Sequence, residues 1–105
     1  MLTNILKDKC TIQSCETTHT ALGDVETWDY GEDFWCRKIS VDTQTRIAYM
    51  QKNTVITDRF MFHGGLELRL GYHRIIYKGK TYELVESGQV IEGNTVVLTK
   101  EVIDG

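Results

Sequence analysis

The stretch HRIIYKGKTYEL, residues 73–84, decides the fold. Apolar and polar residues alternate on both sides of the pair Lys78-Gly79. A period of two is typical of β-strands, in which successive side chains point to opposite faces. A glycine between two such runs readily adopts the positive φ that a tight turn requires. The stretch therefore predicts a basic β-hairpin with strands over residues 74–77 and 81–86.

The same alternation continues outward from this hairpin. It predicts further strands over residues 9–16, 25–30, 34–41, 54–63 and 95–103. Residues 17–24 are polar and contain Gly23, so they are expected to be a loop or a hairpin connection. Residues 87–94, with two glycines, are expected to be a loop. Residues 66–70 are compatible with either a short strand or one helical turn. Turn signals about every ten residues predict an all-β fold, a small antiparallel β-barrel or sandwich.

One segment breaks the alternation. In DTQTRIAYMQK, residues 42–52, Ile47 and Met50 lie near helical spacing, and Asp42 or Thr43 can cap a helix start. Asn53 is expected to end the element. The sequence thus predicts one short helix, or a long loop excursion, between strands of a single domain that spans residues 1–105.

Composition excludes some classes of function. The 105 residues contain 12 basic and 15 acidic side chains, a net charge of −3, which argues against a protein that mainly coats nucleic acid. No apolar run approaches the ~20 residues of a membrane span, and we expect no membrane association. The first residues do not resemble a signal peptide, and three cysteines without a CxxC motif predict reduced thiols in a cytosolic protein.

No constellation of residues predicts catalysis. His19, His63 and His73 have no local spacing to a cysteine that indicates a nucleophile–base pair. Cys10 and Cys15 lie within loose zinc spacing, but no second pair follows them. Gly64-Gly65 lacks the surroundings of a phosphate-binding loop. We therefore expect a protein that is not an enzyme and that holds no cofactor and no metal.

A possible nucleic-acid surface comes from basic residues interleaved with tyrosines. The set is Arg69, Arg74, Lys78, Lys80, Tyr72, Tyr77 and Tyr82. Stacking of bases on such rings is one interpretation. The simpler one, which we favour, is that the tyrosines fill the barrel and the lysines keep a hairpin edge in solvent.

The ordered set of strands resembles the head-closure, or head–tail joining, proteins of long-tailed bacteriophages. The segments that carry the resemblance, in order, are CTIQSC, VETWDY, FWCRKIS, QTRIAYMQK, TDRFMFH, RIIYKGKTYEL and NTVVLTKEVI. The most specific of them is RIIYKGKTYEL, which matches a basic position, a hydrophobic strand, a glycine turn and a strand that begins near an aromatic residue. The segment after the third strand is shorter here than is usual in that family.

The resemblance implies a structural virion protein that forms a homo-oligomeric ring in the neck, between the portal or adaptor and the tail. Its partners would be copies of itself, portal and adaptor proteins, tail proteins, and packaged DNA contacted without sequence specificity. It would reside in the host cytoplasm during assembly. By position, residues 41–57 would be a loop that lines or closes the channel, or else a helix that covers one end of the barrel.

The resemblance also suggests two groups of site residues. The channel loop would use Asp42, Thr43, Gln44, Thr45, Arg46, Gln51, Lys52 and Asn53. The hairpin at an assembly interface would use Arg74, Tyr77, Lys78, Gly79, Lys80 and Tyr82. Two alternatives remain open: a tail-completion or terminator protein, and a monomeric SH3-like or OB-like module that binds peptide or nucleic acid.

Overall fold

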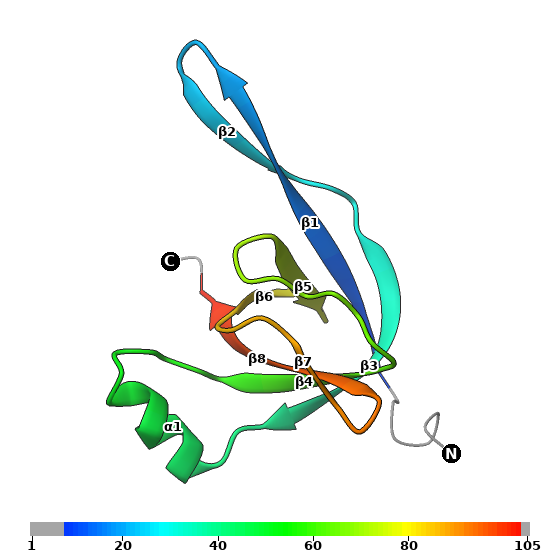
Figure 1. Ribbon diagram of the computed structural model, residues 1–105, viewed down its shortest axis with the longest axis vertical. Coiled ribbons are helices and arrows are strands. Elements are labelled where there is room, and N and C mark those ends of the chain that lie inside the picture. Colours follow the sequence, from blue (N-terminus) through cyan, green and yellow to red (C-terminus); the bar gives the residue numbers. More distant parts are fainter. Residues whose placement is uncertain (1–7, 104–105) are drawn as a thin grey trace.

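A computed structural model describes residues 8–103, which form eight strands and one helix (Figure 1). The elements are β1 (Asp8–Thr20), β2 (Gly23–Trp28), β3 (Glu32–Ser40), α1 (Thr43–Met50), β4 (Asp58–His63), β5 (His73–Tyr77), β6 (Lys80–Leu84), β7 (Gln89–Ile91) and β8 (Asn94–Val102). No helix within these residues has both the length and the apolar character needed to cross a membrane.

Six strands close into an antiparallel barrel in the order β1-β3-β4-β8-β6-β5. Closure comes from pairing of β5 with β1, which runs from Thr11 opposite Ile76 to Ser14 opposite His73. β2 extends one end of β1, and β7 pairs with the start of β8. The predicted all-β barrel with one short helix is therefore confirmed.

The hairpin of residues 73–84 forms β5 and β6 as predicted. Tyr77 lies opposite Lys80, so the connection is the two-residue turn Lys78-Gly79. Both turn residues have positive φ, 49° and 77°, as a type I′ turn requires. Glycine adopts this conformation at little cost, and the turn joins two strands whose inward side chains are buried.

The core is centred on three aromatic rings. The ring centroid of Phe60, on β4, lies 5.6 Å from that of Tyr77 and 5.1 Å from that of Tyr82, both in edge-to-face contact. The other buried members of the core are Cys10, Ile12, Cys36, Phe62, Leu68, Ile75, Leu84 and Val97. Because each strand contributes alternate residues, the predicted period of two corresponds to the inside and outside of the barrel.

Residues 66–70 are neither a strand nor a helical turn. The amide of Leu66 donates to the side-chain oxygen of Thr95, and the amide of Gly88 donates to the carbonyl of Leu68. Leu68 is buried and completes the core. The backbone of residues 66–70 therefore bonds to side chains and to a loop, and it does not join a strand ladder.

The predicted connection of residues 17–24 is mostly strand. β1 continues to Thr20, a two-residue turn follows, and β2 starts at Gly23. Figure 1 shows this β1–β2 hairpin projecting away from the barrel. Side chains of residues 16–27 are all exposed. Residues 17–20 are exposed on both faces and show no burial alternation, so periodicity could not reveal this part of the ribbon.

Two further boundaries differ from the prediction. Residues 54–57 precede β4 rather than belong to it, because the amide of Thr54 donates to Tyr49 of α1 instead of to a strand. The predicted loop of residues 87–94 contains β7, which turns into β8 through Glu92 and Gly93, both with positive φ. β7 is exposed along its whole length, so it too lacks a burial pattern.

Replacing Phe60 with alanine is expected to remove the centre of the core. Phe60 is fully buried against two rings, so the change should lower the free energy of unfolding by about 3–5 kcal/mol. Urea denaturation of both proteins measures this difference. Val55→Ala is the control, because Val55 is 62% exposed and should shift stability by less than about 0.5 kcal/mol. Equal effects of both changes would contradict the assignment of the core.

Alkaline pH is expected to unfold the protein through its buried tyrosines. Burial raises the pKa of Tyr77 and, together with the charges of Asp58 and Glu101, that of Tyr82. The unfolded chain then loses these protons first, at about pH 10, so stability is retained below that pH and falls as pH rises above it. Phenolate absorbance of the buried tyrosines and circular dichroism should change together as the pH is raised.

Candidate functional site

Residues 41–57 leave the barrel between β3 and β4 and return to it. Val41 and Ile56, at the two ends, are buried and hold the segment to the core. Between them, α1 has no buried residue, and it stands beside the barrel (Figure 1). The helix therefore does not cover one end of the core, which was one of the two expectations for this segment.

The predicted channel residues lie mainly in solvent. Thr45 is half-buried and the other seven are exposed, namely Asp42, Thr43, Gln44, Arg46, Gln51, Lys52 and Asn53. Asn53 follows the last helical turn with a φ of 58°, which confirms that the helix stops before it. The structure thus brings these residues together on one protruding element, and their role in a channel stays a prediction.

Few contacts attach α1 to the barrel. The guanidinium of Arg46 donates to the carbonyl of Thr57 at 3.2 Å, and the hydroxyl of Tyr49 donates to the carboxylate of Glu86. At the start of the helix, the side chain of Thr45 lowers the pKa of the Asp42 carboxyl, and the positive charge of Arg59 acts in the same direction. These polar contacts position the helix without burying it.

The predicted interface hairpin divides into core and surface residues. Tyr77 and Tyr82 are buried in the barrel, so a partner cannot reach their rings without unfolding. Lys78, Gly79 and Lys80 are exposed at the turn. These three residues remain candidates for an assembly contact.

Arg74 lies at the opposite end of the hairpin from the turn. Its guanidinium stacks on the ring of Trp28, 4.2 Å from the centroid, and its Nε donates to Gln13 at 2.7 Å. Arg74 therefore fastens β5 to the base of the projecting β1–β2 hairpin. The basic and aromatic residues do not form one stripe, because the two inward tyrosines are buried and the remaining residues lie at two ends of the barrel.

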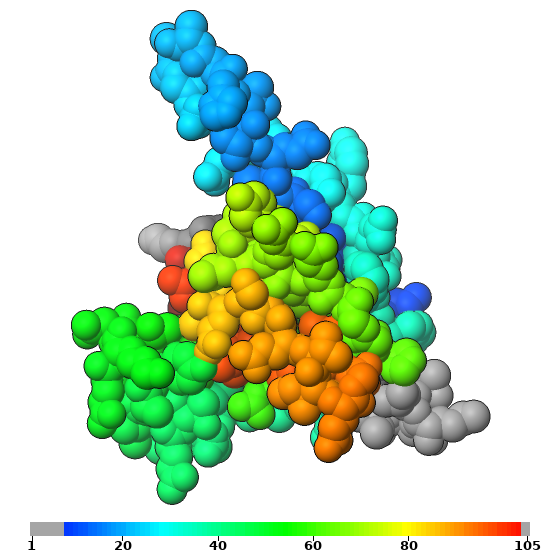
Figure 2. Space-filling view, in the orientation of Figure 1, coloured from blue at the N-terminus to red at the C-terminus, as the bar shows by residue number. Residues whose placement is uncertain are grey.

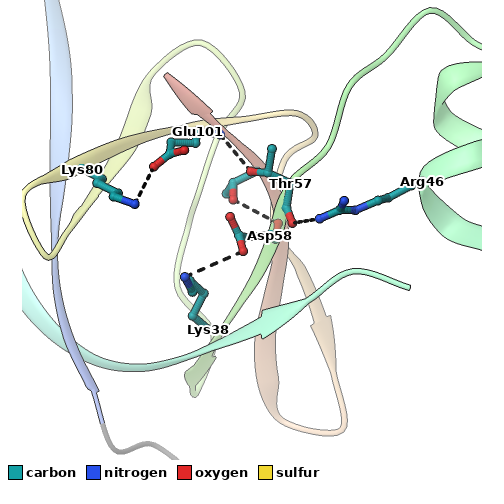
Figure 3. A network of polar contacts seen from close by, with 7 residues as sticks. Lys38, Arg46, Thr57, Asp58, Lys80 and Glu101 are labelled. Atoms are coloured by element: carbon teal, nitrogen blue, oxygen red, sulfur yellow. Dashed lines mark hydrogen bonds and ion pairs between the residues drawn. The ribbon is translucent and has the colours of Figure 1, made fainter. Parts of the chain in front are cut away.

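A polar network closes the end of the barrel at which β4 and β6 begin (Figure 3). Lys38 lies 3.9 Å from Asp58, and Lys80 lies 3.2 Å from Glu101. The side chain of Thr57 accepts a hydrogen bond from the amide of Glu101 at 2.9 Å. Lys80 is largely in solvent, so its pair with Glu101 is expected to contribute little stability, whereas the Lys38–Asp58 pair is more buried. The two lysines neutralise acidic groups beside the buried tyrosines.

The outer face of β3, β4 and β8 carries a groove that the sequence did not predict. Its apolar lining includes Ile39, Met61, Val96, Leu98 and Ile91, and its volume is about 390 Å³. Figure 2 shows α1 in green and the β7 hairpin in orange on either side of this face. Met61 on β4 and Val96 and Leu98 on β8 are apolar residues at outward positions, and this signal could have indicated a second covered surface.

No histidine side chain makes a hydrogen bond to a cysteine side chain among residues 8–103. His19 lies near the tip of the projecting hairpin and contacts Asp24 at 2.6 Å, whereas Cys10 and Cys36 are buried in the core. A hydrogen bond to Cys36 and burial raise the pKa of the Cys10 thiol, and the same hydrogen bond lowers the pKa of the Cys36 thiol. No group of three metal-ligating side chains gathers in the described part of the chain.

Comparison with known proteins finds a similar fold in a solved structure and indicates no activity. No family model matches the chain, and no curated protein matches it. Its structure is similar to the solution structure of protein SF1141 from Shigella flexneri 2a, with a TM-score of 0.77 over 100% of both chains and 19% sequence identity. At this identity, the similarity establishes a shared fold over the full length.

The α1 segment is expected to exchange its amide hydrogens much faster than the barrel strands. It has no buried residue and few contacts, so local opening should cost little free energy. Hydrogen exchange of the isolated protein measures this, with β4 and β8 as internal references. Tyr49→Phe, which removes the hydroxyl contact to Glu86, should accelerate exchange in α1 alone. Protection of α1 equal to that of β4 would contradict the expectation.

Proposed function

We propose that this protein is a structural connector of a phage head–tail interface, which forms a ring and joins the portal or adaptor to the tail. The observation that carries the proposal is the ordered set of strand motifs from CTIQSC to NTVVLTKEVI, with RIIYKGKTYEL as its most specific member. The barrel built from these motifs is compatible with that role. Closure of the DNA channel by residues 41–57 is part of the proposal.

Two projecting elements favour a protein that functions in an assembly over one that functions as an isolated monomer. The β1–β2 hairpin and the α1 segment both project from the barrel, and neither contributes to the core. Elements without a core of their own gain little stability from an isolated subunit. A ring supplies the missing contacts, because each subunit can place its projections against the next one.

The rival from another class is a monomeric module that binds a peptide or a nucleic acid. The apolar groove beside β7 favours this rival, since an extended or helical peptide can bury apolar side chains in such a groove. Nucleic-acid binding would use exposed rings, and Tyr30, Trp35 and Tyr72 are exposed. Arg74 covers Trp28, and Arg69 lies 5.2 Å from the ring centroid of Tyr72. A tail-completion or terminator ring is the closest alternative within virions.

The native mass in solution tests the proposal. We expect a closed oligomer from the protein alone, or a defined complex when it is mixed with the portal-side or tail-side protein encoded beside it. Native mass spectrometry and analytical ultracentrifugation measure both. A monomer that ignores these neighbours at high concentration would refute the connector role. Steep salt-dependent binding of single-stranded DNA by that monomer would instead support the nucleic-acid module.

A further inference from the structure

The projecting β1–β2 hairpin, called the arm below, has the geometry of a docking element. Six residue pairs, from Cys15 opposite Trp28 to Thr20 opposite Gly23, form a two-stranded ribbon about 20 Å long. From Glu16 to Thr20, β1 pairs only with β2 within residues 8–103, so both edges of this part of the ribbon are free. At its tip Leu22 is 101% exposed, and Val25 beside it is 47% exposed.

The base of the arm is held firmly. The amide of Cys15 donates to the carbonyl of Tyr72 at 2.8 Å, and the carboxylate of Asp29 accepts from the amide of Ser14 at 2.9 Å. Gly31 lies so close to β1 that a Cβ atom there would come within 2.7 Å of the carbonyl oxygen of Ile12. The arm therefore extends in a defined direction, which lowers the entropy cost of docking.

Charge is divided sharply between the arm region and the rest of the chain. Residues 10–36 contain six acidic residues and no lysine or arginine. Since the chain has 15 acidic and 12 basic residues, the remainder has nine acidic and twelve basic residues. An acidic projection on an otherwise basic molecule favours contact between copies, because the arm of one copy is attracted to the body of another.

The groove on the outer face of β3, β4 and β8 matches the arm in chemistry. Its apolar floor contains Met61, Val96 and Leu98. Arg59 lines the groove, and Arg37 lies on the same face of β3, opposite Met61 in the ladder. Neither arginine makes an ion pair with another residue in the range 8–103. The face thus offers apolar surface beside two arginines that make no ion pair within residues 8–103. The groove also contains Glu86, which accepts from the hydroxyl of Tyr49, and Arg59 interacts electrostatically with Asp42.

We infer that the arm of one subunit docks in the β3–β4–β8 groove of a second copy. Leu22 and Val25 supply the apolar contact, and Glu16, which lies on the same ribbon face as Val25, faces the arginines at the groove. Asp24 and Glu26 lie on the opposite face and add to the negative charge of the arm. The inference deepens the connector proposal and rests on it, since it names the surfaces by which the ring would close.

The contact is heterologous, because the arm and the groove are different surfaces of the same subunit. Each copy can therefore offer its arm to one neighbour and its groove to another, and repetition closes into a ring when the rotation permits. A symmetric dimer that exchanges two arms uses the same contact twice. Both arrangements require an intact arm and an intact groove.

Two variants separate the two halves of the contact. Leu22→Asp places a charge at the exposed arm tip, and Ile91→Asp places one at the rim of the groove, where Ile91 is 52% exposed. Leu70→Asp is the matched control, since Leu70 is also 52% exposed but belongs to neither surface. Circular dichroism should show native folds for all three.

Analytical ultracentrifugation is expected to show self-association by the wild type and by Leu70→Asp. Each of Leu22→Asp and Ile91→Asp alone should associate at least about tenfold more weakly, because docking would bury an unpaired charge. An equimolar mixture of these two variants should form one-to-one complexes and nothing larger, because only one intact arm and one intact groove can meet. Association of the wild type should weaken as salt is raised.

The possible failures are distinguishable. An oligomer that survives in both single variants overturns the arm–groove contact and leaves the connector proposal standing. A wild type that is monomeric alone but binds a head-side or tail-side protein also overturns the arm–groove contact and leaves the connector proposal standing. A wild type that is monomeric and binds neither overturns both. A mixture of variants in which no complex forms shows that the arm and the groove do not meet each other.

Discussion

The structure depends on the hydrogen-bonded pairing of one strand, β1, with three other strands along its length. The first part of β1, from Asp8 to Ile12, pairs with β3, and residues Thr11 to Ser14 pair with β5 to close the barrel. From Cys15 onward β1 pairs with β2 and leaves the barrel. Because one continuous backbone carries closure and projection, the direction of the arm follows from the barrel geometry. A hairpin joined through a loose linker would have no such direction.

The aromatic cluster makes this closure favourable. Phe60 contributes from β4, while Tyr77 and Tyr82 contribute from the strands on the far side of the β1–β5 seam. A 105-residue chain can build only one modest core, and these three rings are, with Phe62, its largest buried side chains. Closure therefore brings the hairpin of residues 73–84, which is local in sequence, against strands that lie both before and after it.

Sequence reasoning succeeded where a strand has one buried and one exposed face. The hairpin around Lys78-Gly79 and the alternation of Phe60 and Phe62 with Arg59 and Met61 could be read directly, because burial follows the pleat. The same reasoning failed for residues 17–20, since both faces of that segment are exposed. The threonines of TTHT favour a strand by propensity, but propensity alone did not outweigh their polarity.

The two candidate surfaces differ in how far the sequence could reveal them. Residues 41–57 could be recognised as an excursion, because the segment is local and its period changes.

The groove could not be found from the sequence in this way. Its floor joins Met61 of β4 with Val96 and Leu98 of β8, more than thirty positions away, and only the β4–β8 register places them side by side. Apolar residues on the outward face of a strand indicate that something covers them, but not what.

The appendages and the barrel have different energetic roles. The barrel buries its apolar residues within one chain, so it can be stable without a partner. The arm and α1 bury almost nothing in the subunit, so their contacts must come from elsewhere to contribute to stability. Such a division lets a subunit fold first and then associate through surfaces whose affinity is adjustable without altering the core. Acidic charge on the arm serves this order of events, because it keeps an exposed ribbon with two free edges soluble until a basic surface neutralises it.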